Sequence, residues 1–278
     1  MRASVLLSGA LLGASVLFDM SLAAAQPCTD LPAERRVSDQ RSGCLALVPI
    51  GPRNLQSRTL IVMLHGDRGG ELEQRHVDGW RRVGQSLAGE DRTVLFMIRP
   101  GYRSPAGSSS GYANPQDDDY TTGNIARVAG SLAVLRRELQ PRRLLLVGHS
   151  GGAATAALVL GQHPDAADAA LLLGCPCDVP PWRMHRSAQR GQPYRPWSAS
   201  LNPLTFVSGI PTGTPVLAAT GARDDNTLPI FAQRWIQAAA ARGVSARFEE
   251  VADHDHQDIL RWPELPARVQ ALIDALPR

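Results

Sequence analysis

The sequence predicts a single domain of the α/β class, built on a mostly parallel sheet with helices on both faces. Short apolar runs of strand character alternate along the chain with longer segments in which apolar residues recur every three or four positions. This alternation is typical of βα units, in which the loops at the carboxyl ends of the strands converge. No repeat or linker divides the 278 residues into two domains.

The expected elements follow one another in a regular order. Strands are expected at residues 45–48, 59–64, 93–98, 143–147, 169–174, 215–220 and 246–251. Helices are expected around residues 77–87, 125–139, 153–160, 231–236 and 265–276. No period is visible in a loop rich in glycine, serine and proline at 99–120, or in a short, irregular, lid-like insertion at about 175–214.

The pentapeptide Gly148-His149-Ser150-Gly151-Gly152 joins the strand at 143–147 to the helix at 153–160. A G-x-S-x-G sequence between a strand and a helix is typical of a nucleophile elbow, a tight turn that exposes a serine hydroxyl above the sheet. Glycines are expected on both sides of the serine because side chains there would collide as the helix folds back over the strand. The alternative interpretation is a plain glycine-rich turn.

A nucleophilic serine needs a general base, and the base needs an orienting acid. Asp224 and His256 each come just after a predicted strand, so both lie on loops where they can meet Ser150. Asp225 and His254 stay open as alternatives for the acid and the base.

The order Ser150, Asp224, His256 is the order in which the α/β-hydrolase superfamily carries its triad, and the sequence resembles that superfamily over nearly its whole mature length. The segment Gly221-Ala222-Arg223-Asp224-Asp225-Asn226 is similar to the acid loop of prolyl-oligopeptidase-type serine peptidases, whose catalytic acid is the first aspartate of the pair. His256-Gln257-Asp258 resembles the histidine loop of related hydrolases, including dienelactone-hydrolase-like domains. The resemblance implies an α/β-hydrolase fold and favours Asp224 and His256.

The strand at 59–64 leads into Leu64-His65-Gly66-Asp67, which resembles the oxyanion loop of the superfamily. The resemblance implies that the backbone N–H groups of Asp67 and Gly151 bind the oxyanion of a tetrahedral intermediate. The alternative is that His65-Gly66 only forms a tight turn.

Aromatic and basic residues are concentrated in the lid-like insertion. The aromatic ones are Trp182, Tyr194 and Trp197, and the basic ones are Arg183, Arg186, Arg190 and Arg195. The aromatic side chains either line a substrate pocket or anchor the segment. The arginines hint only faintly at an anionic substrate, because all 29 basic residues of the chain are arginine. The run Asp117-Asp118-Asp119 is expected to be a solvated cluster.

Composition argues against several other functions. The net charge is only +3 and the arginines are scattered, so nucleic-acid binding is not expected. His254 and His256 could together ligate zinc, but no other cluster has ligand spacing, so neither a metal nor a cofactor is expected. The expected partner is a small-molecule ester or a short peptide, and the oligomeric state stays open.

The first 25 residues have the features of a signal peptide, with Arg2, an apolar run and the cleavage motif Ala23-Ala24-Ala25 before Gln26. We therefore expect a mature domain of residues 26–278 that is periplasmic or secreted, without stable membrane insertion. A lipoprotein anchored through Cys28 is the alternative, although the residues before it do not resemble a lipobox.

Four cysteines in an exported chain suggest disulfides. A bridge between Cys28 and Cys44 would close an N-terminal loop. Cys175 and Cys177 would form a small bridge or stay as thiols, so their pairing is open.

These features predict an exported serine hydrolase that cleaves a carboxylic ester or a related acyl bond through an acyl-enzyme. A small peptidase or aminopeptidase is the alternative, although the short segment before the first strand has no room for the N-terminal propeller usual in prolyl-oligopeptidase-type enzymes. A binding protein that kept the fold without turnover is a further alternative.

Overall fold

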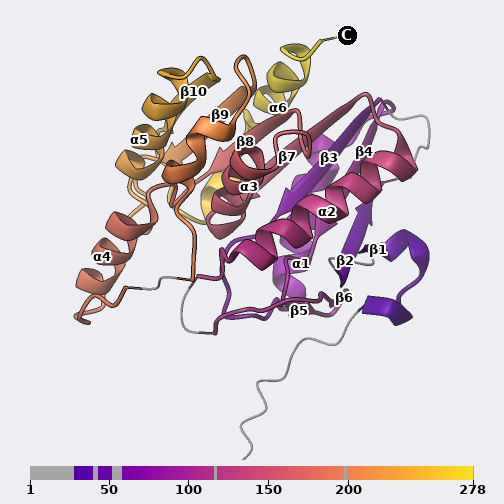
Figure 1. Ribbon diagram of the computed structural model, residues 1–278, viewed down its shortest axis with the longest axis horizontal. Coiled ribbons are helices and arrows are strands. Elements are labelled where there is room, and N and C mark those ends of the chain that lie inside the picture. Colours follow the sequence, from indigo (N-terminus) through magenta and orange to yellow (C-terminus); the bar gives the residue numbers. More distant parts are fainter. Residues whose placement is uncertain (1–27, 40–42, 52–57, 116–117, 197–198, 278) are drawn as a thin grey trace, which may run out of the picture.

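The computed structural model describes residues 28–39, 43–51, 58–115, 118–196 and 199–277, and Figure 1 shows how its elements are arranged. The strands are β1 (Arg36–Asp39), β2 (Gly43–Ile50), β3 (Thr59–Leu64), β4 (Arg92–Met97), β5 (Arg103–Ser104), β6 (Gly107–Ser108), β7 (Arg143–His149), β8 (Ala169–Leu173), β9 (Pro215–Gly221) and β10 (Ser245–Val251). The helices are α1 (Gln74–Leu87), α2 (Thr122–Leu139), α3 (Gly151–Gln162), α4 (Val179–Gln189), α5 (Pro229–Ala240) and α6 (Leu265–Asp274). Short 3₁₀ segments are η1 (Cys28–Asp30), η2 (Ala33–Arg35), η3 (Pro203–Gly209) and η4 (Asp258–Arg261).

In the described part of the chain, a sheet of eight strands has the order β1-β2-β4-β3-β7-β8-β9-β10. The strands from β4 to β10 in this order are parallel to their neighbours. At the other edge, β2 pairs antiparallel with β4, and β1 pairs antiparallel with β2. Parallel neighbours need crossover connections, which place helices over the faces of the sheet. The mostly parallel sheet predicted from the sequence is thus confirmed.

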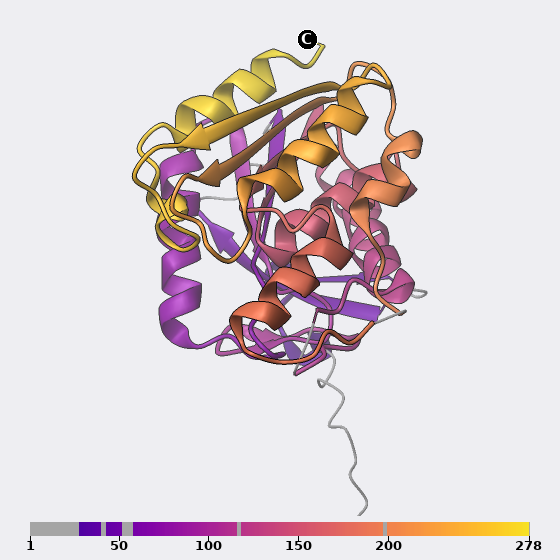
Figure 2. The same ribbon diagram turned by 90° about the vertical axis from the view of Figure 1, so that its left-hand side faces the viewer.

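Successive residues of each strand point to opposite faces of the sheet, and each face has its own core. All six residues of β3 are buried. Leu60, Val62 and Leu64 pack with α2, α3 and α5 on one face. Ile61 and Met63 pack with α1 and α6 on the other face. Figure 1 shows α2 and α3 in front of the sheet, and Figure 2 shows α1 and α6 together on its opposite side.

Helix α2 begins and ends where local signals predict. The hydroxyl of Thr121 accepts a hydrogen bond from the N–H of Asn124 at 3.2 Å, which satisfies one of the free donors of the first turn. At the other end, Gln140 has a left-handed φ of 45° and its N–H donates to the carbonyl of Arg136. Pro141 then prevents the helix from continuing.

Both segments that were expected to be irregular contain regular structure. The lid-like insertion contains α4 and η3, and the loop at 99–120 contains the hairpin of β5 and β6. Helix α4 buries Val179 and Arg183, so hardly any apolar period marks it in the sequence. Its prolines stand in the first turn, where they are compatible with a helix instead of breaking it. The short edge strand β1 was also missed.

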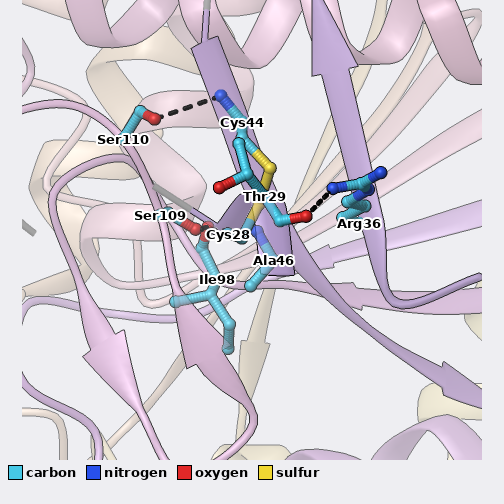
Figure 3. The surroundings of a disulfide bond; sticks show 8 residues. All are labelled: Cys28, Thr29, Arg36, Cys44, Ala46, Ile98, Ser109 and Ser110. Carbon is cyan, nitrogen blue, oxygen red and sulfur yellow. Dashed lines mark hydrogen bonds between the residues drawn. A yellow bond between two sulfur atoms is a disulfide. The ribbon is translucent and has the colours of Figure 1, made fainter. Parts of the chain in front are cut away.

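A disulfide joins Cys28 to Cys44. Figure 3 shows this bridge at the start of β2, where the hydroxyl of Ser110 accepts a hydrogen bond from the N–H of Cys44 at 3.1 Å. The neighbouring hydroxyl of Ser109 accepts the N–H of Ala46 at 3.0 Å. The bridge therefore ties the N-terminal segment to β2, and the two serines tie β2 to the loop that follows β4.

A second disulfide joins Cys175 to Cys177 directly after β8. Both cysteines are buried, and the carbonyl of Cys177 accepts the N–H of Leu204 at 3.1 Å. This bridge lies where the lid-like insertion leaves the sheet.

The expectation that the protein is exported rests on its N-terminal segment. The predicted signal peptide at residues 1–25 lies outside the described residues. In the part of the chain that the structure describes, no helix is long and apolar enough to cross a membrane.

Removing the first bridge should destabilise the protein. We expect Cys28→Ala/Cys44→Ala to lower the free energy of unfolding by about 3 kcal/mol, because the bridge restricts a closed loop in the unfolded chain. For a domain of this size that corresponds to a fall in Tm of roughly 6–12 °C, measured by scanning calorimetry. Cys175→Ala/Cys177→Ala is the comparison, since its loop is much shorter and the chain-entropy loss is smaller. A Tm of the first variant equal to that of the wild type would show that the bridge does not form.

Candidate active site

Loops from several parallel strands meet at the carboxyl edge of the sheet. Asp67 lies just past β3, Ser150 follows β7, Asp224 lies just past β9 and His256 lies on the loop after β10. This is where the topology of a parallel α/β sheet places functional loops.

The turn at Ser150 has the backbone of a nucleophile elbow. Ser150 has φ of 54° and ψ of −123°, a region that residues with side chains rarely adopt. Its N–H donates to the carbonyl of Leu173 at 2.8 Å. A Cβ at Gly148 would lie 2.4 Å from the carbonyl oxygen of Gly152, and one at Gly152 would lie 2.1 Å from that of Leu64. The two glycines are therefore required by close backbone approach.

Three predicted side chains form a connected series of hydrogen bonds. Nε2 of His256 lies 3.0 Å from Oγ of Ser150, and Nδ1 of His256 lies 2.8 Å from Oδ2 of Asp224. All three residues are buried. The distances and the order are those that a nucleophile, its base and an orienting acid need.

Asp224 is held by its own loop as well as by the histidine. Its Oδ1 accepts the N–H groups of Asn226 at 2.9 Å and Thr227 at 2.7 Å, and its Oδ2 accepts the hydroxyl of Thr227 at 2.7 Å. Burial by itself would raise the pKa of Asp224, but the hydrogen bonds from His256 and Thr227 outweigh it and hold that pKa below its ordinary value. The carboxylate is therefore ionised at neutral pH.

Thr227 was missed by the sequence analysis. Besides its bonds to the acid, its Oγ1 lies 3.0 Å from Nδ1 of His256. A threonine three residues after a loop aspartate is the local signal that could have indicated it, since such pairs hydrogen-bond within turns. Gly174, with φ of 51°, leaves the space for this group: a Cβ there would lie 3.1 Å from Oδ2 of Asp224.

The neighbouring alternatives point elsewhere. Asp225 is exposed, and its backbone carbonyl accepts hydrogen bonds from two side chains of α4. Nδ1 of His254 lies 2.7 Å from a backbone carbonyl of its own loop. The structure thus brings Asp224 and His256, and not these neighbours, to the serine.

His149, which directly precedes the serine in the pentapeptide, connects the loop that carries His256 to the elbow. Its Nε2 donates to the carbonyl oxygen of His256 at 2.6 Å. Burial first, and then the neighbouring imidazole of His256, lower the pKa of His149 to about 3. The ring is therefore a neutral, fixed hydrogen-bond donor at physiological pH.

The predicted oxyanion residues lie against each other. A Cβ at Gly66 would lie 2.9 Å from the Cβ of Ser150, so the loop after β3 touches the elbow. A Cβ at Gly151 would lie 2.1 to 2.4 Å from the carboxylate atoms of Asp67. The loop after β3 therefore contacts the elbow, and the carboxylate of Asp67 lies beside Gly151, whose N–H is predicted to bind the oxyanion.

Two buried side chains compensate this carboxylate. Nη1 of Arg99 lies 2.8 Å from Oδ1 of Asp67, and the hydroxyl of Tyr120 donates to Oδ2 at 2.6 Å. Arg99 is only 2% exposed and follows β4, next to β3 in the sheet. Neither partner was predicted from the sequence, because both lie in the loop at 99–120, which was expected to be irregular.

His65 connects the same two loops. Its Nε2 accepts the N–H of Arg99 at 3.0 Å, and its Nδ1 lies 2.8 Å from the carbonyl oxygen of Gly66. Since Nε2 accepts, Nδ1 carries the proton and donates. Burial, followed by the charge of Arg99, lowers the pKa of His65 well below its usual value. The neutral ring therefore fixes the backbone that leads to Asp67.

The aspartate run at 117–119 is not a solvated cluster, which corrects the sequence analysis. Asp118 and Asp119 are buried, while Asp117 lies outside the described residues. Asp118 accepts from Nε and Nη2 of Arg183 at 2.6 and 2.7 Å. Asp119 pairs with Nη2 of Arg99. Each buried carboxylate meets an arginine that is distant in the sequence, which local polarity could not indicate.

A cavity of about 840 Å³ opens over the serine. Trp182 of α4 lines it, and the indole N–H of Trp182 lies 3.4 Å from Oδ1 of Asn226, beside the acid loop. Tyr194, predicted as a pocket residue, is 39% exposed and does not line the cavity, because the proline-containing segment after α4 carries it to the surface. Trp197 lies outside the described residues.

Comparisons with known proteins agree on the fold. Residues 59–198 match the family described as alpha/beta hydrolase fold. No curated protein is detectably similar in sequence. An esterase of Pyrococcus furiosus is 16% identical with a TM-score of 0.64, over 86% of this chain and 88% of that one.

Other solved structures share the architecture. The acylaminoacyl peptidase of Pyrococcus horikoshii is 14% identical with a TM-score of 0.61, over 86% of this chain but 40% of that one. A Butyrivibrio proteoclasticus protein solved with bound ferulic acid is 14% identical with a TM-score of 0.60, over 83% of this chain and 96% of that one. At these identities the likeness concerns the fold alone.

The buried Asp119 should make stability depend on pH. Burial raises the pKa of Asp119 to about 7, although Arg99 acts in the opposite direction, and its Oδ2 has no hydrogen-bond partner among the described residues. The unfolded pKa is near 3.8. The folded protein therefore keeps a proton that the unfolded chain has released, so this stabilising contribution is complete below about pH 4 and is lost as the pH rises through about 7.

The comparison is between the wild type and Asp119→Asn. We expect the free energy of unfolding of the wild type, minus that of the variant, to fall as the pH rises from about 4 to about 7. Urea denaturation at a series of pH values measures it. A difference that does not change with pH would mean that Asp119 is ionised throughout this range.

Proposed function

The chain belongs to the α/β-hydrolase fold family, and on that premise we propose that it is an exported serine hydrolase that cleaves a carboxylic ester or a related acyl bond. The observation that carries the proposal is the hydrogen-bonded series of Ser150, His256 and Asp224, joined at 3.0 and 2.8 Å, with Ser150 on a strained turn. These side chains would supply the nucleophile, the general base and the orienting acid.

In the proposed acylation step, the Ser150 hydroxyl attacks the carbonyl carbon of the substrate while Nε2 of His256 accepts its proton. The N–H groups of Asp67 and Gly151 bind the oxyanion that forms. When the tetrahedral intermediate collapses, His256 returns the proton to the leaving alcohol, and the acyl group stays on the serine.

In deacylation, His256 accepts a proton from water, and the hydroxide attacks the acyl-enzyme. The carboxylic acid leaves as the proton returns to the serine oxygen. Asp224 stabilises the imidazolium in both steps and holds the ring in one tautomer, with Nδ1 protonated. The hydroxyl of Thr227 keeps the carboxylate in the orientation that this requires.

An ester is favoured over a peptide as the substrate. The similar esterase has a counterpart in this chain over 88% of its length, whereas the acylaminoacyl peptidase has one over only 40%. A small peptidase and a binding protein without turnover are the alternatives. Hydrolysis of p-nitrophenyl esters against aminoacyl-p-nitroanilides separates these alternatives, because a binding protein cleaves neither.

Export rests on the predicted signal peptide at residues 1–25. The disulfides support it, since such bridges persist in oxidising compartments. Loss of the first 25 residues from the mature protein, seen by intact mass, is the direct test.

The nucleophile can be tested with a fluorophosphonate probe. We expect the probe to label the wild type at Ser150 and to leave Ser150→Ala unlabelled, with kcat for short-chain p-nitrophenyl esters lower by about four to six orders of magnitude. Ser187→Ala is the matched control, because Ser187 lines the same cavity but is not on the elbow. Equal labelling of wild type and Ser150→Ala would end the assignment.

The acid can be tested by two amide substitutions on one loop. We expect Asp224→Asn to lower kcat by about 10⁴-fold, because the amide cannot stabilise the imidazolium and favours the wrong tautomer. Asp225→Asn should change kcat by less than about threefold, since its side chain is exposed. Steady-state kinetics with one ester measure both, and circular dichroism controls for folding. The reverse ranking would make Asp225 the acid.

A further inference from the structure

The cavity over Ser150 is lined by more arginines than carboxylates. Arg68 lines it on the side of the loop after β3, and Arg186, Arg190 and Arg195 line it on the side of α4 and the segment that follows. Within the described ranges, none of these guanidinium groups forms an ion pair. The positive charge of these four guanidinium groups is therefore available to a ligand in the cavity.

The acidic residues of the same lining are already compensated. Asp67 is paired with Arg99 and bonded to Tyr120. Asp118 is held by Arg183 through Nε and Nη2. The carboxylates at the cavity wall thus face inward to buried partners and do not offset the arginines described above.

Two like charges lie one turn apart at the end of helix α4, Arg186 in its last turn and Arg190 at its C-cap. Arg186 and Arg190 are separated by four residues, a spacing at which like charges repel. Partial burial first, and then the charge of Arg190, lower the pKa of Arg186, while the charges of Asp225 and Asp224 act in the opposite direction. The contacts of the cations are with neutral amides: Nη1 of Arg186 lies 2.5 Å from Oε1 of Gln189, and Nη2 of Arg68 lies 2.7 Å from the side-chain oxygen of Gln257.

We propose that this cavity binds an ester that carries a second, anionic group, a carboxylate, and that Arg186 and Arg190 hold that carboxylate while the scissile carbonyl lies at Ser150. This inference rests on the proposed function and adds a substrate class to it. Guanidinium groups suit it because they keep their charge and form paired hydrogen bonds with planar or tetrahedral anions. An anion between two repelling cations also removes their repulsion.

The reaction itself is unchanged by the anionic group. Water adds across the ester, the bond between the carbonyl carbon and the alcohol oxygen breaks, and the second group leaves with its part of the substrate. Its binding affects the position of the ester and therefore kcat/KM.

The test uses two matched pairs of esters. In one pair the anion is on the acyl part, p-nitrophenyl hydrogen adipate against its neutral methyl ester. In the other it is on the alcohol part, 4-carboxyphenyl butyrate against 4-(methoxycarbonyl)phenyl butyrate. We expect kcat/KM for the anionic member of at least one pair to be roughly 10- to 100-fold higher at low salt. The preference should shrink as the ionic strength rises.

Substitutions of the two arginines test whether they cause the preference for anionic esters. Arg186→Gln/Arg190→Gln should reduce the anionic-to-neutral ratio of kcat/KM towards one, and Arg186→Lys/Arg190→Lys should keep part of it. Arg247→Gln is the matched control, because Arg247 is exposed on the edge strand β10, outside the cavity lining. Equal kcat/KM within both pairs, or a preference that survives the double glutamine variant, overturns the proposal.

A binding measurement separates this proposal from the proposed function. Calorimetric titration of Ser150→Ala with the two anionic esters needs no turnover. Saturable binding of at least one of them that is lost in Ser150→Ala/Arg186→Gln/Arg190→Gln supports the anion site even if no ester is cleaved. Absence of binding of both overturns the site even if neutral esters are cleaved, in which case the serine hydrolase assignment stands alone.

Discussion

The turn at Ser150 touches the end of β3 with no side chain between the two backbones. A Cβ at Gly152 would lie 2.1 Å from the carbonyl of Leu64, and one at Gly66 would lie 2.9 Å from the Cβ of Ser150. This contact brings the turn that carries Ser150 next to the loop that carries Asp67. The register of the parallel strands then delivers the acid and histidine loops to the same edge, so the other interactions of the site depend on this close approach.

The same approach creates an electrostatic problem that other parts of the chain resolve. It presses the carboxylate of Asp67 against Gly151, where negative charge would oppose a developing oxyanion. Arg99 and Tyr120 take up that charge from the next loop. Because Arg99 also holds Asp119, the loops after β3 and β4 are joined by one buried polar network. Removing Arg99 would leave the carboxylate of Asp67 without its ion-pair partner.

The arginines of α4 and its C-cap differ in their surroundings: one is buried in an ion pair, and two line the cavity. Arg183 is buried and fixes the helix to the body of the protein through Asp118. Arg186 in the last turn of this helix and Arg190 at its C-cap line the cavity. Whether an arginine stabilises the fold or is available to a ligand therefore depends on its burial and its ion-pair partner, and not on its residue type. Composition could not make this distinction in a chain whose basic residues are all arginine.

The sequence by itself predicted the parallel strands in chain order and the strand-turn-helix unit at Ser150, because buried parallel strands are continuous apolar runs and the turn needs glycines at fixed spacing. It also indicated Asp224 and His256, since both follow such runs. Tertiary structure alone decided that Asp224 and not Asp225 meets the histidine, that Thr227 joins them, and which arginines meet the buried aspartates. Those contacts join residues that are far apart in the chain or neighbours within one loop, and the local polarity of the sequence does not indicate which residue will be the partner.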